Sequence, residues 1–365
     1  MEAKMTKTKP LATYHETNLG RIYHADSLDV MKRQETETVD LIMTSPPFAL
    51  TRKKDYGNEQ EDTYLDWFRN FAVEFQRILK KDGSLVIDLG GAWKPGLPVR
   101  SLYHFKLLIM LCEEYNFHLA QEFYWWNPSK LPTPAEWVNV RRIRVKDGVN
   151  TVWWLSKSPW PRASNRRVLQ PYSDSMKTLL SNGYKAKMRP SGHDISDKFA
   201  IDNGASIPPN LIAIPNTESN SGYLRYCKDN SIKAHPARFP AALPEYFIRM
   251  VTDPDDVVLD PFAGSCVTGE VAERLGRKWV CAELIESYLE GAKGRFVQKV
   301  ELPKGKAQKN DESGYYRIPH PGLLWNGVDE RDSAPLPEDG GRQRPANISK
   351  SNVCRDDVTI IKTAE

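Results

Sequence analysis

The sequence predicts an α/β protein whose core is a Rossmann-like, doubly wound and mostly parallel sheet. Short, branched apolar runs such as residues 39–43 (VDLIM) are typical of strands that are buried on both faces. They alternate with helical patterns, clearest over residues 63–81, where apolar side chains recur on one face. The alternation weakens after residue 155 and resumes after residue 230, which indicates a large domain carrying an insert.

The first half of this domain is expected to span residues 21–155, behind an N-terminal arm of residues 1–20. Strands are expected at residues 21–26, 39–43, 84–88, 118–126 and 151–155, and helices at 28–31, 63–81 and 102–115. The dipeptide Asp82-Gly83 should end the second helix. Residues 51–62 form a polar, charged loop that is long enough to close over a site.

The insert, residues 156–230, is rich in Ser, Pro, Asn, Gly and basic residues and has little periodicity. We expect it to be loop-rich but folded, because several large apolar side chains could seed a small core. These are Trp160, Tyr172, Phe199, Ile207 and Leu211.

The second half of the domain, residues 231–300, repeats the strand and helix alternation. Strands are expected at residues 257–260 and 279–282, and helices at 244–251, 268–275 and 285–299. Residues 301–365 are polar and aperiodic, which predicts an extension that is mobile or laid on the surface.

Composition and charge limit the classes of function that the protein can have. The chain of 365 residues has no apolar run near the length of a membrane span and no secretory signal, so we expect a soluble, cytoplasmic protein. Its five cysteines form no C-x-x-C pair, and we expect no metal site. Residues 141–190 hold twelve Lys or Arg against two acids, although the whole chain carries only +4. This local excess favours a phosphate backbone as partner, the alternative being a solvated basic face.

The motif Thr44-Ser45-Pro46-Pro47-Phe48 follows the first buried apolar run. Two consecutive prolines remove two amide donors and restrict the backbone, so their carbonyl groups point in set directions. The aromatic ring of Phe48 follows at once, where a flat ligand could stack. The motif therefore suits a planar group with an amine on its edge, although an ordinary proline-rich loop would show the same letters.

A glycine loop follows the strand at residues 257–260 and contains Asp260, Phe262, Gly264 and Ser265. It matches G-x-G-x-x-G except that Cys266 takes the second glycine position, which argues against a dinucleotide with its pyrophosphate. Glu283 ends the next strand, nineteen residues after Gly264, where a carboxylate can accept both hydroxyl groups of a ribose. The loop and its acid together predict an adenosine-type cofactor without phosphates.

Taken together, the motifs resemble those of the S-adenosylmethionine-dependent DNA amino-methyltransferases of the β order, in which the catalytic motif precedes the target-recognition region and the cofactor loop comes last. The resemblance is closest to the PvuII-type cytosine-N4 enzymes. It is carried by residues 43–50 (MTSPPFAL), 123–132 (FYWWNPSKLP), 189–195 (RPSGHDI) and 233–240 (KAHPARFP). It covers residues 20 to 300, with the insert as target-recognition region.

The resemblance implies roles for particular residues. Ser45 and the carbonyl group of Pro46 would accept hydrogen bonds from the exocyclic amine of the target base, with Pro47 in the same catalytic block and Phe48 stacking on the flipped base. Asp26 would lie near the adenine of the cofactor, and Glu283 would hold its ribose. The other implied cofactor contacts are Asp260, Phe262, Gly264 and Ser265 in the glycine loop and His235 and Phe239 before it.

The implied substrate is double-stranded DNA, and the implied reaction is methyl transfer to cytosine N4. The residues expected to contact DNA are Arg52, Lys53, Arg141, Arg142, Arg144, Arg189 and His193. Two alternatives stay open. One is the same reaction on adenine N6, which only Ser45 and the closeness of the PvuII-type match separate from the cytosine reaction. The other is a DNA-binding regulator without turnover. The resemblance also implies a monomer that acts alongside a restriction endonuclease without contacting it.

Overall fold

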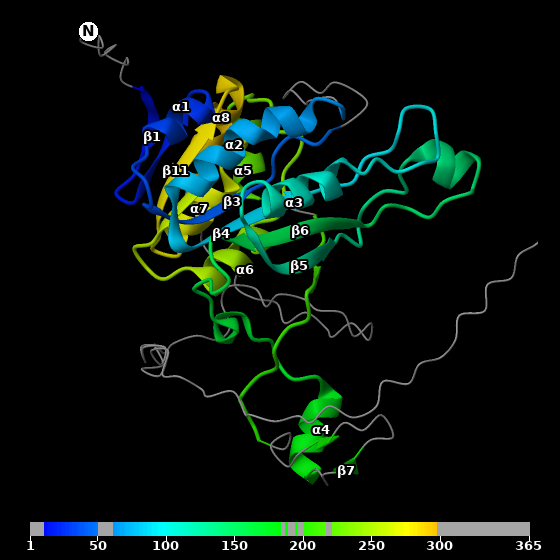
Figure 1. Cartoon of the computed structure of the whole chain (residues 1–365). Helices are drawn as coiled ribbons and strands as arrows, with labels where there is room; N and C mark the ends of the chain where they lie inside the picture. The colour runs from blue at the N-terminus through cyan, green and yellow to red at the C-terminus, as the bar shows by residue number, and fades with distance from the viewer. Residues whose placement is uncertain are drawn as a thin grey trace, which may run out of the picture. The chain divides into compact units, whose positions relative to one another are not determined.

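A nine-stranded sheet dominates the computed structural model, which describes residues 11–49, 61–183, 187–188, 194–195, 201–216 and 221–297. In spatial order its strands are β1 (Thr13–Glu16), β2 (Gly20–His24), β11 (Lys278–Glu283), β10 (Val257–Asp260), β3 (Val39–Thr44), β4 (Leu79–Leu89), β6 (Val149–Ser156), β5 (His118–Trp126) and β9 (Leu211–Ala213). Only β1 and β6 run against the others. The sheet is therefore mostly parallel, as predicted (Figure 1).

Helices cover both faces of the sheet because its inner strands are apolar on both sides. Leu41 and Met43 of β3 pack into the cluster formed by α6 (Ala242–Val251), α7 (Val267–Arg274) and α8 (Glu286–Val297). Ile42, between them, packs into the opposite cluster with α1 (Ser27–Lys32), α2 (Tyr64–Ile78) and α3 (Tyr103–Glu113). This alternation gives a three-layer, doubly wound architecture with a core on each side.

The boundary between α2 and β4 differs from the prediction. The helix ends at Ile78 instead of residue 81, and β4 begins at Leu79, so that Asp82-Gly83 lies within the strand. Tertiary contacts outweigh local helical spacing here. Leu79 pairs with Val39 of β3, and the ammonium group of Lys80 contacts the buried carboxylate of Asp40 at 2.8 Å.

Among the residues of the insert that the structure describes, the large apolar side chains do not gather into the small separate core that we expected. Trp160 and Ile207 are 84% and 67% exposed, and Phe199 lies outside the described residues. Leu211 belongs to β9, which extends the main sheet beside β5. The other described elements of the insert are the 3₁₀ turn Asn165–Val168, α4 (Asp174–Asn182), β7 (Lys187–Met188), β8 (Asp194–Ile195) and α5 (Gly222–Asp229).

Ion pairs join the start of the insert to the amino-terminal ends of the central strands. The guanidinium group of Arg162 contacts Asp40, which is almost fully buried, and also Asp256 just before β10. Arg167 contacts Asp253 at 2.7 Å. These contacts hold the insert to the edge of the sheet opposite the carboxyl ends of its parallel strands.

The predicted C-terminal extension, residues 301–365, lies outside the described residues. Within the described part of the chain, no helix is both long and apolar enough to cross a membrane.

Candidate active site

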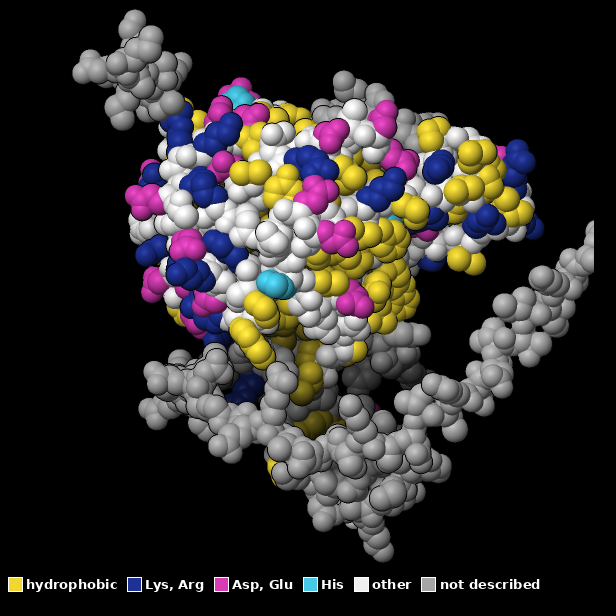
Figure 2. Space-filling view, in the orientation of Figure 1, with side chains coloured by type: hydrophobic (Ala, Val, Ile, Leu, Met, Phe, Trp, Pro, Cys, Tyr) yellow, Lys and Arg dark blue, Asp and Glu magenta, His cyan; other side chains and the backbone are white. Residues whose placement is uncertain are grey.

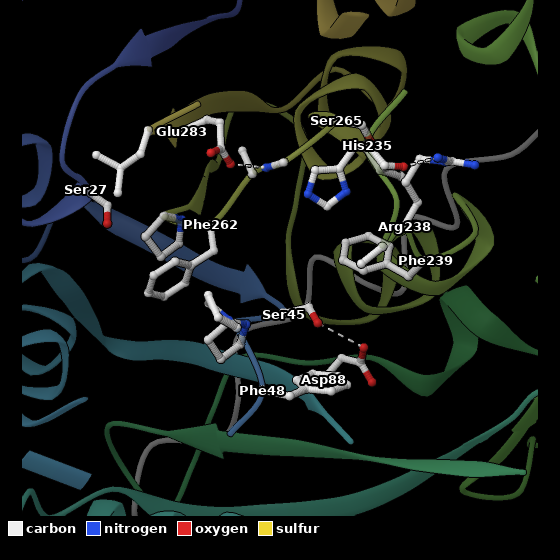
Figure 3. Close-up of a pocket in the computed structure, with 18 of the residues that line it drawn as sticks. Ser27, Ser45, Phe48, Asp88, His235, Arg238, Phe239, Phe262, Ser265 and Glu283 are labelled. Atoms are coloured by element: carbon white, nitrogen blue, oxygen red, sulfur yellow. Dashed lines mark hydrogen bonds between the residues drawn. The ribbon is translucent and has the colours of Figure 1, made fainter. Parts of the chain in front are cut away.

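A cavity of about 740 Å³ opens at the carboxyl ends of the parallel strands (Figure 3). The segments after β2, β3, β10 and β11 all contribute to its wall, as do the ends of β4 and β5. Because β6 runs the other way, its first residues reach the same edge, and Asn150 also lines the cavity. The site thus lies where ligands usually bind to doubly wound sheets.

The predicted catalytic motif forms one wall of this cavity. Ser45, Pro46, Pro47 and Phe48 all line it, directly after the fully buried strand β3. The ring of Phe48 lies against the backbone of Gly90, where an added Cβ would come within 2.5 Å of the ring. A glycine is therefore required beside Phe48.

A chain of hydrogen bonds begins at Ser45. Its hydroxyl group donates to Oδ2 of Asp88 at 3.2 Å, Asn150 Nδ2 donates to Oδ1 of Asp88 at 3.3 Å, and Lys130 Nζ donates to Oδ1 of Asn150 at 3.3 Å. All four side chains line the cavity. Burial raises the pKa of Asp88 to about 6, against the opposing effect of the hydrogen bonds from Asn150 and Ser45. Asp88 is thus an ionisable acceptor directly behind the Ser45 hydroxyl.

The glycine loop forms the other end of the cavity, where Phe262, Gly264 and Ser265 line the wall. Gly264 has a φ of 53°, and an added Cβ would lie 3.0 Å from Nε2 of His235. Cys266 has a φ of 56°, a left-handed conformation that glycine adopts more easily. The departure from the glycine pattern therefore leaves the shape of the loop intact.

Glu283 and Asp26, for which the resemblance implies contacts to the cofactor, both line the cavity. Oε2 of Glu283 accepts the N–H of Gly264 and Oε1 accepts that of Ile285, each at 2.9 Å. Burial raises the pKa of Glu283. The side chain of Asp26 caps α1 by accepting the N–H of Leu28, and it also lines the cavity.

His235, Arg238 and Phe239 complete the cavity on the side of the glycine loop (Figure 3). The imidazole of His235 meets the ring of Tyr288 edge-on at 4.4 Å between centroids. Burial lowers the pKa of His235 to about 4, so this side chain is neutral at pH 7.

Asp260, for which the resemblance implies a cofactor contact, lies inside the protein and not on the cavity wall. It is 1% exposed and does not line the cavity. Its carboxylate accepts the hydroxyl groups of Thr44 and Thr268, each at 2.7 Å, and the N–H of Phe262. Asp260 therefore links the end of β3, the glycine loop and α7 from within the protein.

Three of the seven predicted DNA contacts are described by the structure, and none of the three lines the cavity. Arg141, Arg142 and Arg144 are exposed in the segment that joins β5 to β6. Arg141 pairs with Glu136, and Arg144 donates to the carbonyl group of Pro98. Arg52, Lys53, Arg189 and His193 lie outside the described residues.

Sequence reasoning missed several polar residues of the cavity, among them Asp88, Asn150 and Lys130. Asp88 carries the same signal that identified Glu283, because both acids stand at the end of a buried strand. Asn150 had no such signal, since it stands at the beginning of an antiparallel strand.

Comparison with known proteins assigns the family. The family model described as DNA methylase matches residues 39–294, and the chain belongs to this family. Type II methyltransferase M.PvuII of Proteus hauseri is 54% identical over 78% of this chain and 85% of its own length. DNA adenine methyltransferase YhdJ of Escherichia coli is 28% identical over 73% of this chain and 79% of its own length.

A solved structure described as PvuII DNA methyltransferase (cytosine-N4-specific) matches with a TM-score of 0.64 and 48% identity. The match covers 78% of this chain and 88% of the solved one. The predicted fold and family are therefore confirmed, and the protein is a DNA methyltransferase.

Proposed function

We propose that this protein transfers a methyl group from S-adenosylmethionine to the exocyclic N4 amine of a cytosine that is flipped out of duplex DNA. The observation that carries the proposal is a single cavity with two unlike ends. The Ser45 to Phe48 motif and Asp88 form one end, and the glycine loop with Glu283 forms the other. A planar amine and an adenosine-type ligand can meet between them.

The glycine-loop end suits S-adenosylmethionine chemically. The carboxylate of Glu283 is held by two backbone N–H groups and keeps further lone pairs for ribose hydroxyls. Gly264 leaves room that a Cβ would take. When bound, S-adenosylmethionine supplies an electrophilic methyl group on a sulfonium.

Ser45 and Asp88 would prepare the amine for attack. The Ser45 hydroxyl donates a hydrogen bond to Asp88. Its oxygen lone pairs therefore remain available to accept a hydrogen bond from the amine. Acceptors at Ser45 and the Pro46 carbonyl group hold the amine hydrogens so that the nitrogen lone pair is less conjugated with the ring and points toward the methyl group. Phe48 stacks on the base and offsets part of the few kcal/mol that unstacking costs. The contribution of the protein is thus positioning and electrostatics.

The proton released by the amine would leave through the same pair. Ser45 accepts it while passing its own hydroxyl proton to Asp88, whose carboxylate has a pKa near 6 and can hold it. This path needs Asp88 ionised before each turnover.

The reaction is tested by incubating the protein with bacterial genomic DNA and S-adenosylmethionine, followed by nucleoside mass spectrometry and sequencing of the modified positions. We expect N4-methylcytosine at one short sequence. N6-methyladenine would overturn the cytosine assignment, and the absence of any methylated base would favour a DNA-binding regulator. Heat-inactivated protein is the control.

We also propose that the methylation protects DNA from a restriction endonuclease, which the type II designation of M.PvuII supports. Plasmid DNA isolated from cells that express the protein should resist an endonuclease that cuts the mapped sequence. Unchanged cleavage would contradict this role.

A further inference from the structure

Residues 127–148, which join β5 to β6, form a projection that starts at the cavity and extends away from the sheet (Figure 1). Asn127 and Lys130, at its base, line the cavity. The structure describes the whole segment, and none of its residues is buried. The projection therefore has no apolar core of its own.

Polar contacts hold the projection in shape instead. The carboxylate of Asp147 accepts the indole N–H of Trp93 at 2.7 Å and also pairs with Arg100, both from the segment that follows β4. Within the projection, Asn139 donates to the carbonyl group of Pro132, and Lys146 donates to that of Lys130. Such bonding presents side chains in a defined arrangement.

The exposed side chains of the projection are apolar and basic together. Leu131, Val140, Ile143 and Val145 are between 48% and 86% exposed. Five Lys or Arg stand among them against two acids, Glu136 and Asp147, both already paired with arginine. Hydrophobic and basic side chains gather at this end of the molecule in Figure 2. Clustered apolar side chains that remain exposed mark a binding surface.

We propose that the projection docks into a groove of duplex DNA beside the flipped target base. Arg141, Arg142 and Arg144 would face the phosphates. The four aliphatic side chains would lie against sugars and base edges, a use of apolar residues that is known from proteins that deform DNA. Charge complementarity favours DNA over another occupant, as does continuity with the end of the cavity that the Ser45 to Phe48 motif forms. The inference rests on the proposed function, since it places the substrate of the same site.

Two variants separate the basic contribution from the apolar one. Arg142→Gln is chosen because Arg141 and Arg144 also support the shape of the projection. It should weaken binding of a duplex with the mapped sequence and lower the slope of log K against log salt by about 0.9, one phosphate contact. Val140→Ser/Val145→Ser should weaken binding by about fivefold at every salt concentration, with the slope unchanged.

Exposed residues elsewhere provide matched controls, Arg33→Gln at the end of α1 and Val73→Ser on α2. Both should bind DNA as the wild type does, and all variants should bind S-adenosylmethionine normally in calorimetry. Wild-type affinity and slope in both projection variants would refute the inference, while methylation by the wild type would leave the proposed function standing. A dimer in solution that Val140→Ser/Val145→Ser dissociates would identify a second copy as the occupant and also overturn it.

Discussion

Replacing Asn150 with leucine should shift the pH dependence of methylation, because Asn150 stabilises the ionised form of Asp88. Burial raises the pKa of Asp88 to about 6, and the hydrogen bond from Asn150 opposes that rise. Activity that needs ionised Asp88 is present above about pH 6 and falls as the pH drops through that value. Leucine keeps a similar volume but donates no hydrogen bond.

The size of the shift follows from the geometry. A hydrogen bond to a charged group contributes roughly 1.5–3 kcal/mol, and the contact of 3.3 Å is long, so the lower end applies. About 1.4 kcal/mol corresponds to one pH unit. The acid limb of kcat/KM should therefore move upward by about one pH unit in Asn150→Leu.

The assay measures kcat/KM for duplex DNA from pH 5 to 9 with labelled S-adenosylmethionine at saturation. Asn230→Leu, an exposed asparagine at the end of α5, is the matched control and should keep the wild-type profile. Asp260 also has a pKa near 6, but it does not contact Asn150, so only a limb set by Asp88 should move. An unchanged limb, or an equal loss at every pH, would refute the proposed use of Asp88.

Three further outcomes test separate parts of the structure. Phe48→Ala should lower kcat/KM for DNA about a hundredfold while cofactor affinity in calorimetry stays within about twofold; equal losses would make Phe48 a fold residue. Gly264→Ala should weaken cofactor binding about tenfold, since the left-handed backbone and His235 both resist a Cβ, and wild-type affinity would contradict this. Asp40→Asn should lower the melting temperature by about 5 °C, because it removes about 2 kcal/mol of ion pairing with Lys80 and Arg162, a figure reduced for the partial exposure of both partners. An unchanged melting temperature would show that these pairs contribute nothing to stability.

Sequence patterns predicted those parts of the site that depend on local order along the chain. Ser45 and Glu283 follow buried apolar runs, and in a parallel sheet the ends of such runs meet at one edge. The position of Asn150 depends instead on the antiparallel pairing of β6 with β4. Tertiary contacts determine that pairing, and local sequence does not show it. The end of α2 at Ile78 likewise follows from pairing between strands, since the helical spacing itself continues further.

The insert was harder to predict because the presence of a large apolar residue in the sequence does not show whether its side chain is buried. Trp160 is the largest apolar residue near its start, yet it is exposed, whereas the short run Leu211–Ala213 joins the main sheet. A three-residue strand has too few positions to show a period of two. Only the partner strand, β5, identifies it.

Asp260 helps to explain how two motifs separated by more than 200 residues come to line one cavity. Its carboxylate bonds to Thr44, the residue before Ser45, and to Thr268 in α7, while β3 and β10 lie side by side in the sheet. The distance from the catalytic motif to the glycine loop is therefore set by strand adjacency and by this buried carboxylate. Neither depends on which motif comes first along the chain. A sheet with the same neighbours could form the same cavity from motifs in the opposite order, so the order is a mark of ancestry more than of mechanism.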